Sequence, residues 1–487
     1  MTALGTGVDG TVRRIDRSYE VRGMVASVTS YDDPDPGEGT VLNQVVREYN
    51  DFGLLTKEYQ EHNGAKDANT LYVQYNYADA QGGLRLESVR YPNGRLVHYT
   101  YGSAGSAADN LNRLDAIKAD NPGVPGTPGD TLVAYTYLGL GTVVVEDFVE
   151  AQVKLDYWGG TSGTYQGFDR FGRVTDQVWT DYGENPDVVI EEYKYGYDRA
   201  GNRLWRENVV SGDLNPAVDL DELYSYDEVY RLVGAARGNL DFTDPDDPVI
   251  ETGTGVFGQD WGLDATGNWD TFNEDEDGDG DADLAQTREH NEVNETGTIG
   301  ATQGPDWADP VYDAAGNMTT LPKPSAPANS IHAKYDAWNR LIKVKDGAVT
   351  VATYAYDGLG RRILKATDSD SPADPDGIDT YEHVFLAGQQ VIETRETAVS
   401  TDQPEAIQPK YQQVWSPRYI DALVLRDENT DADGLCDDGR LYYLSDANFN
   451  VTALIDATGA VVERYVYTAY GEATIYDSDW SETRNTS

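Results

Sequence analysis

Two stretches of closely spaced carboxylates have the clearest potential for chemistry in this sequence. The first, NEDEDGDGDADLAQTREHNE, spans Asn273 to Glu292. Its carboxylates recur at alternate positions, and Gly280 stands where a calcium-binding loop bends sharply. Gln286 occupies the position at which an EF-hand needs a bidentate glutamate, so the spacing predicts weak calcium binding or, alternatively, a solvated acidic loop. The candidate metal ligands are Asp275, Asp277, Asp279, Asp281 and Asp283.

The second acidic stretch, DENTDADGLCDDGR, repeats part of this spacing. Asn429, Asp431 and Asp433 precede Gly434 with the same intervals. Arg440 stands at the last ligand position, where it would repel a cation, so the match is weaker. We treat these three residues as a second calcium candidate, with an ordinary hairpin loop as the alternative.

No pattern in the sequence selects a catalytic group. No G-x-S-x-G nucleophile motif occurs, and the acidic residues are too numerous to single out a glycosidase pair. The single cysteine, Cys436, has no activating neighbour in the sequence. We therefore expect no catalytic residues and a protein that is not an enzyme. The histidines are scattered without metal-ligand spacing: His62, His98, His290, His332 and His383.

A recurring motif predicts the strands and turns that hold these loops. It is clear in GYDRAGNRLWRE, from Gly196 to Glu207. Tyr195 and Tyr197 alternate as on one face of a strand. Asp198 suits the first position of a type I turn, and Gly201 stands where the chain needs positive φ. The motif predicts a β-hairpin with a G1 bulge.

The motif is repeated along the chain, with tolerated replacements at the glycine position. Tyr230 and Asn339 stand there in two copies, and asparagine is the residue besides glycine that best tolerates positive φ. Asp169, Asp198 and Asp227 follow one another at intervals of 29 residues, which indicates a repeat architecture. The turn aspartates of the clear copies are Asp169, Asp198, Asp227, Asp264, Asp313, Asp336 and Asp357.

Composition agrees with a β-rich repeat protein. The chain has 487 residues, with 34 Tyr against 9 Phe and with 49 Gly and 20 Pro, which favours strands and turns over long helices. Its net charge of −48 argues against binding nucleic acid. No apolar run is long enough for a transmembrane helix, and the first residues lack the apolar region of a signal peptide.

With these repeats, the chain resembles the YD-repeat, or Rhs, family of bacterial surface and secreted proteins. The resemblance runs from about Asp16 to Asp477 and is most specific between Arg440 and Ile475, which is similar to the Rhs-associated core. Phe449 replaces a glycine that is usual in that core. The residues that match the core are Asp446, Asn450, Val451, Asp456, Gly459, Arg464, Tyr465, Tyr467, Tyr470 and Gly471.

The resemblance implies an all-β fold of antiparallel hairpin repeats that form a spiralling strip or a hollow β-shell. It also implies a function: a non-catalytic shell or scaffold segment of an exported, secreted or cell-surface protein that encloses or displays a C-terminal toxin or another Rhs segment. None of the Asp-Pro pairs continues into the family's DPxGL self-cleavage segment, so we expect the chain to be truncated before that segment and the effector. The alternatives are a cell-surface adhesin that binds carbohydrate through exposed aromatic residues, assisted by calcium, and an undetected hydrolase.

The repeats and inserts predict a linear organisation. A YD-repeat strip occupies residues 1–268 and continues over 301–409, interrupted by an acidic insert loop at 269–300. Core-like hairpins follow at 410–477, and we expect a disordered tail at 478–487.

Overall fold

Almost every element of the structure is a β-strand that pairs antiparallel with the next strand along the chain. The computed structural model describes residues 7–78, 84–159, 166–215, 218–244, 248–368, 377–401, 403–481 and 483–484. The prediction of an all-β fold built from antiparallel hairpins is confirmed. The chain forms two compact units, each assembled from separated segments, which cuts across the linear division expected from the sequence.

Unit 1 consists of residues 1–130, 310–416 and 425–440. It holds two ribbons of consecutive hairpins, one from β1 to β8 and one from β23 to β31. Its strands are β1 (Arg14–Tyr19), β2 (Val25–Tyr31), β3 (Val41–Tyr49), β4 (Leu55–Glu61), β5 (Tyr72–Tyr77), β6 (Leu86–Arg90), β7 (Leu96–Thr100), β8 (Ala116–Asp120), β23 (Val311–Tyr312), β24 (Met318–Lys323), β25 (Ala326–Tyr335), β26 (Leu341–Asp346), β27 (Val349–Tyr356), β28 (Arg362–Thr367), β29 (Thr380–Ala387), β30 (Gln390–Thr397) and β31 (Pro409–Trp415).

Unit 2 consists of residues 131–309, 417–424 and 441–487. The unit boundaries fall within β9 (Pro128–Leu138), β32 (Leu423–Glu428) and β33 (Gly439–Ser445). The other strands of unit 2 are β10 (Thr142–Phe148), β11 (Val153–Asp156), β12 (Asp176–Asp181), β13 (Val188–Tyr197), β14 (Arg203–Asn208), β15 (Asp221–Tyr226), β16 (Leu232–Gly238), β17 (Leu240–Asp241), β18 (Val249–Ile250), β19 (Phe257–Leu263), β20 (Trp269–Asp275), β21 (Leu284–His290), β22 (Thr296–Gln303), β34 (Val451–Asp456), β35 (Val461–Tyr467), β36 (Ala473–Tyr476) and β37 (Thr483–Arg484).

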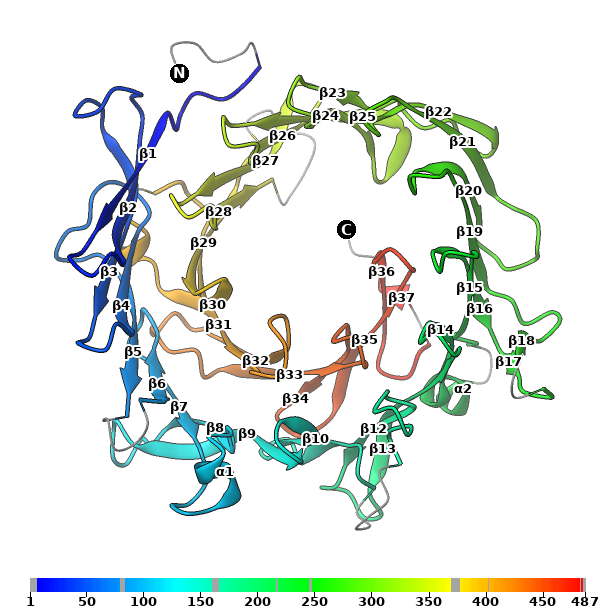
Figure 1. Cartoon of the computed structure of the whole chain (residues 1–487), viewed down its shortest axis with the longest axis horizontal. Helices are drawn as coiled ribbons and strands as arrows, with labels where there is room; N and C mark the ends of the chain where they lie inside the picture. The colour runs from blue at the N-terminus through cyan, green and yellow to red at the C-terminus, as the bar shows by residue number, and fades with distance from the viewer. Residues whose placement is uncertain are drawn as a thin grey trace. The chain divides into compact units, whose positions relative to one another are not determined.

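Within unit 1 the two ribbons pack face to face, with β3 and β4 beside β27 and β29 (Figure 1). Asn43 of β3 donates to the Tyr356 carbonyl at 2.9 Å, and Gln60 of β4 donates to the Leu386 carbonyl at 2.6 Å. Because side chains alternate along a strand, every second residue enters the space between the ribbons. Val28 and Ile363 are examples, with 0% and 2% of their surface exposed.

Unit 2 follows the same plan, with its second ribbon running from β33 to β37. Phe148 of β10 stacks on Trp179 of β12 at 5.2 Å and on Tyr442 of β33 at 5.0 Å. Trp179 Nε1 donates to the Ser445 carbonyl at 3.1 Å, which joins the two ribbons. In both units, core side chains therefore lie between two packed ribbons.

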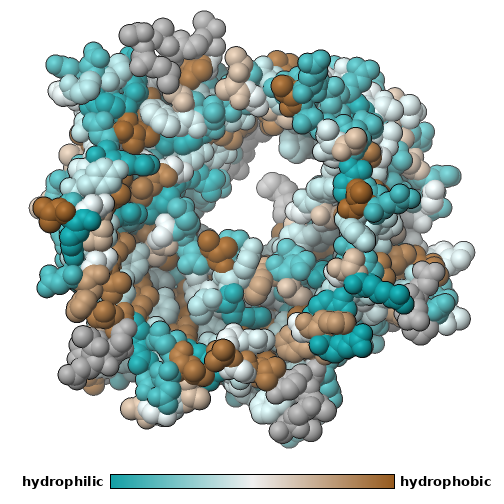
Figure 2. All heavy atoms as spheres, in the orientation of Figure 1, coloured by the Kyte–Doolittle hydropathy of each residue, from teal (hydrophilic) through white to brown (hydrophobic). Residues whose placement is uncertain are grey.

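Helices are short wherever the structure describes the chain: α1 (Ala107–Asn110), α2 (Val209–Leu214) and the 3-10 turn η1 (Pro404–Ala406). In that part of the chain, no helix has the length and hydropathy needed to cross a membrane. The face in Figure 2 is mostly hydrophilic, with hydrophobic residues in small scattered groups.

Two expectations about segments are corrected. Residues 269–300 are not one loop, because β20, β21 and most of β22 continue the ribbon and only about eight residues form the acidic turn. The segment after residue 477 is packed as far as Trp480, which is 1% exposed in a cluster with Leu220 and Val466. Residues 485–487 lie outside the described residues.

Candidate functional site

The repeated Tyr-Asp motif forms the predicted turn at each clear copy. In the Asp198 copy, the Gly201 amide donates to the Asp198 carbonyl at 3.3 Å, and the Asp198 amide donates to the Asn202 carbonyl at 2.9 Å. The carboxylate of Asp198 accepts the amides of Gly201 and Asn202. Gly201 has φ 98°, and the pairing register shifts at Tyr197, as a bulge requires. The predicted turn is confirmed.

In many copies of the motif, the tyrosine bonds its hairpin to the one before it. Tyr197 donates its hydroxyl to the Val174 carbonyl at 2.8 Å, and Tyr356 donates to the Leu341 carbonyl at 2.8 Å. The accepting carbonyl lies two residues after the positive-φ residue of the preceding turn. The same relation holds for Tyr49, Tyr77, Tyr101, Tyr226, Tyr335 and Tyr467.

The arginine that ends several turns bonds forward. Arg340 donates from Nε to its own turn's Asp336 carboxylate at 2.7 Å and from Nη1 to the Asp357 carbonyl of the next turn at 3.0 Å. Arg173, Arg231 and Arg361 are arranged alike. The tyrosine and the arginine of the motif therefore hydrogen-bond to backbone carbonyls of neighbouring hairpins, an arrangement that we call the backbone stitch. The sequence analysis missed this role because the partners lie in other repeats.

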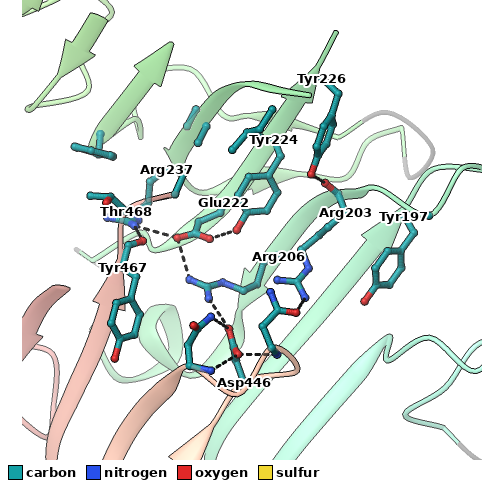
Figure 3. Close-up of a pocket in the computed structure, with 18 residues that line it drawn as sticks. Tyr197, Arg203, Arg206, Glu222, Tyr224, Tyr226, Arg237, Asp446, Tyr467 and Thr468 are labelled. Carbon is teal, nitrogen blue, oxygen red and sulfur yellow. Dashed lines mark hydrogen bonds and ion pairs between the residues drawn. The ribbon is translucent and has the colours of Figure 1, made fainter. Parts of the chain in front are cut away.

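A pocket in unit 2 lies where strands β14, β15, β16 and β19 meet the turns at both ends of the β34–β35 hairpin (Figure 3). Its volume is about 370 Å³. Three arginines and two carboxylates line it, so its ionic side chains sum to one positive charge in a chain of net charge −48. They are Arg203, Arg206, Arg237, Glu222 and Asp446.

Glu222 is the centre of the ionic network. Arg206 Nη2 and Arg237 Nη2 lie 2.9 Å and 3.0 Å from Glu222 Oε1, and the Tyr224 hydroxyl donates to Oε2. Arg206 also reaches Asp446 Oδ2 at 3.4 Å. Burial raises the pKa of Glu222, but the two guanidinium groups outweigh it, and the pKa is lowered overall.

Arg203 differs from the other two arginines because, among the described residues, no carboxylate lies within ion-pair distance of its guanidinium. Its Nη2 donates to Asn448 Oδ1 at 3.1 Å, and its guanidinium lies 4.4 Å from the Tyr195 ring centre. Among the described residues, no acceptor contacts its Nη1 or its buried Nε. The pocket therefore has unused donor capacity at Arg203.

An aromatic cluster adjoins the pocket. Leu232 and Ala235 line the pocket and also pack against the buried cluster of Trp261, Phe272 and Leu284. Tyr470 follows the pocket residues Thr468 and Ala469, is 58% exposed, and packs its ring 4.7 Å from Trp269. Sequence reasoning identified Asp446, Tyr467 and Tyr470 only as parts of the repeat core and did not predict that they lie around a pocket.

The first acidic loop brings three of its five candidates together. Ligand oxygens of Asp275, Asp277 and Asp283 lie within 4.8 Å of one another. Both oxygens of Asp275 accept loop amides, from Gly278 and Gly280. Asp279 and Asp281 are not in the cluster. Converging carboxylates suit a hard cation such as calcium, but strands rather than helices flank the loop, so it is not an EF-hand.

The second acidic loop does not form such a cluster. Asp431 and Asp433 accept amides of Asp433 and Leu435 respectively, and Asn429 accepts the Ala432 amide. Within the described ranges, neither aspartate belongs to a group of three metal-binding side chains. Each of the three side chains closes a local turn, and metal binding by Asn429, Asp431 and Asp433 stays a prediction.

The residues considered for catalysis lie apart or in unsuitable environments. Cys436 is buried, and burial together with Glu393 raises its pKa to about 12, which opposes thiolate formation. His62 and His383 stack on each other at 5.8 Å between the ribbons of unit 1, and none of their ring nitrogens has a hydrogen-bond partner among the described residues. This pair is part of the core.

The family model described as RHS Repeat matches residues 335–373, which include the turns at Asp336 and Asp357. The same turn recurs through both units, as described above. Residues 335–373 are therefore an RHS repeat. No curated protein matches it in sequence.

Solved structures share the fold of this chain. The crystal structure of TcdB2-TccC3-Cdc42 has a TM-score of 0.63 and 14% identity, over 94% of this chain and 23% of that one. A Tc holotoxin pore from Photorhabdus luminescens has a TM-score of 0.62 and 14% identity, over 94% and 22%. The TcdB2-TccC3 crystal structure has a TM-score of 0.61 and 14% identity, over 94% and 23%. The chain thus spans less than a quarter of these chains.

Proposed function

We propose that the chain is a wall segment, a non-catalytic structural part of an exported RHS-type protein that encloses or displays a partner polypeptide such as a toxin domain. The observation that carries the proposal is the backbone stitch. The tyrosine and the arginine of the motif are used to join one hairpin to the next, so hairpins can be added one after another without a separate core for each.

The structural relatives support this role. One of them is named as a Tc holotoxin pore, and the match covers 94% of this chain but less than a quarter of each of those chains. A segment of that size fits one part of a larger wall. The partner, its toxicity and the route of export belong to the proposal.

Electron microscopy of the complete gene product, with limited proteolysis, tests whether the chain is part of a wall that encloses a partner. We expect a continuous curved sheet and a partner segment that resists protease inside the complete product but is cleaved when it is expressed alone. Equal cleavage in both settings, or images of separate globular domains, would contradict enclosure.

We also propose that the cluster of Asp275, Asp277 and Asp283 binds calcium weakly, as the spacing in the sequence suggested. A cation bound only by the folded chain raises the melting temperature by mass action. Millimolar calcium should raise the melting temperature of the unmodified protein and of an Asp281→Asn variant, whose side chain lies outside the cluster. The Asp283→Asn variant should lose most of the increase. A melting temperature that calcium leaves unchanged in all three proteins removes the proposal.

A further inference from the structure

The first hairpin of unit 1, formed by β1 and β2, makes only the forward half of the backbone stitch. Arg22 donates from Nη1 to the Asn50 carbonyl of the next turn at 2.7 Å. Tyr49 of the next hairpin donates to the Val25 carbonyl of β2 at 2.8 Å. Tyr19, the tyrosine of this first copy, is 59% exposed, and within the described ranges its hydroxyl has no hydrogen-bond partner. The backward bond of this copy is therefore not made.

The outer edge of β1 is unpaired. Among the described strands, β1 pairs with β2 alone, and its residues from Asp16 to Tyr19 are exposed at the end of the ribbon (Figure 1). The Glu20 amide donates to the Met24 carbonyl within the hairpin at 2.9 Å. Because successive amides of a strand point to opposite sides, the amides of Arg17 and Tyr19 point away from β2. The edge therefore offers backbone donors and acceptors to one further strand.

The outermost strand of the first ribbon of unit 2, β22, has a closed edge. On the side away from β21, the Ile299 amide donates to Asp309 Oδ1 at 2.9 Å. The Ala301 amide donates to Asp306 Oδ1, also at 2.9 Å. Trp307, between the two aspartates, packs against a buried aromatic cluster and holds them in place. No carboxylate of the described residues closes the β1 edge in this way, so β1 remains open to pairing.

The backbone stitch specifies which strand fits this edge. In the copy at Asp336, the carbonyl that accepts the next tyrosine belongs to Leu341, and Arg340 immediately before it donates to the carbonyl of the next turn. At β1, the matching groups are the Tyr19 hydroxyl and the Glu20 carbonyl. The segment that fits β1 is therefore an extended strand that directly follows a turn of the same kind, with an arginine and then an apolar residue after the positive-φ position.

We propose that the outer edge of β1 binds a further Tyr-Asp hairpin. Its strand pairs antiparallel with β1, its carbonyl accepts the Tyr19 hydroxyl, and its turn arginine donates to the Glu20 carbonyl. The inference rests on the proposed wall function, because it names the kind of segment that extends the wall at this edge. A second copy of the chain fits less well, because two β1 edges would offer two tyrosine donors and no turn carbonyl, and each copy carries a net charge of −48.

A synthetic peptide that copies residues 336–346 tests the proposal, since it contains both stitch groups of its own copy. Fluorescence anisotropy of the labelled peptide, titrated with the full chain, should show saturable binding. A scrambled peptide of the same composition should not bind. Hydrogen exchange should slow at residues 14–20 when the peptide is bound and stay unchanged at β22, because a new strand protects only the edge that it pairs with.

Variants of the chain separate the edge amides from the side chains. The Arg17 amide points away from β2, so Arg17→Pro should fold normally and weaken peptide binding about tenfold or more. Arg17→Ala keeps the amide and should stay within about threefold of the unmodified chain. Tyr19→Phe lacks the hydroxyl and should bind several-fold more weakly. Tyr230→Phe, at a tyrosine of unit 2 that is similarly exposed, should bind like the unmodified chain.

Absence of peptide binding overturns the proposal, as does equal binding of the scrambled peptide or full binding by the Arg17→Pro variant. Sedimentation that shows a dimer of the unmodified chain and a monomer of Arg17→Pro overturns it in favour of a second copy at β1. These outcomes are distinct from the protease test of enclosure, because a chain that encloses nothing could still bind the peptide, and an enclosing wall could leave the β1 edge unused.

Discussion

At the scale of single residues, the side chains of the Tyr-Asp motif form hydrogen bonds to different parts of the chain. The aspartate bonds within its own turn, the tyrosine to the preceding hairpin and the arginine to the following one. At some copies the aspartate is also buried between the ribbons. Asp357, which is 2% exposed, pairs with Arg361, and Arg361 Nη1 reaches Glu58 of the opposite ribbon at 2.7 Å.

Neutralisation of the turn aspartate should destabilise the protein most at the buried copy, Asp357. Asp357→Asn removes one of the two carboxylate partners of buried Arg361, and we expect the free energy of unfolding to fall by about 3 kcal/mol. The matched control is Asp313→Asn, in a turn whose partner is the neutral amide of Asn317 at 2.9 Å. That change should cost about 1 kcal/mol or less. Urea unfolding followed by fluorescence measures both, and equal losses would show that burial at Asp357 has no special effect.

The stacked histidines make unit 1 sensitive to acid. Burial and the nearby Arg395 lower the pKa of His383 to about 4, and burial and the charge of His383 lower the pKa of His62. An unfolded histidine protonates near pH 6.5, so below that pH protons favour the unfolded state. The stabilising effect of the neutral rings is complete above pH 6.5 and declines as the pH falls toward 4, by up to about 3 kcal/mol for His383.

Comparison with a variant isolates this contribution. His383→Leu cannot be protonated, so the difference between its free energy of unfolding and that of the unmodified protein should change between pH 7 and about pH 4.5. The buried Asp221, whose pKa burial raises to about 6, acts in the opposite sense but is common to both proteins. A difference that is constant with pH would mean that His383 does not titrate as proposed.

At the scale of elements, the hairpin turn determines which residues are tolerated at its glycine position. Gly172, Gly201 and Gly360 have positive φ there, and so do Tyr230 at 66° and Phe449 at 64°. The backbone of Phe449, which replaces the usual glycine, adopts the same conformation as the glycines. A side chain in this conformation is strained by roughly 1–2 kcal/mol.

Removal of that strain should stabilise one turn and not the other. Tyr230 is 63% exposed, so Tyr230→Gly should raise the free energy of unfolding by about 0.5–1 kcal/mol. Phe449 stacks on Tyr419 at 4.8 Å and lies under Arg418, so Phe449→Gly should lose packing and gain no stability. Thermal unfolding of the two variants tests this, and destabilisation by Tyr230→Gly would contradict it.

At the scale of the whole molecule, the dominant property is charge. The chain has 85 acidic and 37 basic residues. Several of its arginines bond within the hairpin turns or form buried ion pairs. Carboxylates without such partners repel one another across the surface, which opposes the folded state at low ionic strength.

Salt should therefore stabilise the protein. We expect the melting temperature to rise by a few degrees when the salt concentration is raised to about 0.3 M, where the screening length falls below about 8 Å. Sodium chloride and choline chloride should act alike, because general screening does not depend on the cation. An effect limited to one cation would indicate specific binding instead, and a decrease would contradict the proposed repulsion.

The sequence by itself determined the turns, the hairpins and the all-β class. These features depend on interactions within about five residues, such as the bonds of the Asp198 carboxylate to the amides of Gly201 and Asn202. Intervals of that length are visible as a repeated motif. The same locality explains one turn that the sequence analysis missed, at Asn291, where asparagines replace both the aspartate and the glycine.

Only the tertiary structure decided which ribbons face each other and what lies between them. Arg206 meets Asp446 across 240 positions of the chain, and Arg361 meets Glu58 across 303. No local pattern encodes such pairings, because either residue is equally compatible with an exposed strand face. The pocket of unit 2 exists only because two distant ribbons pack together, whereas each turn around it forms from its own few residues.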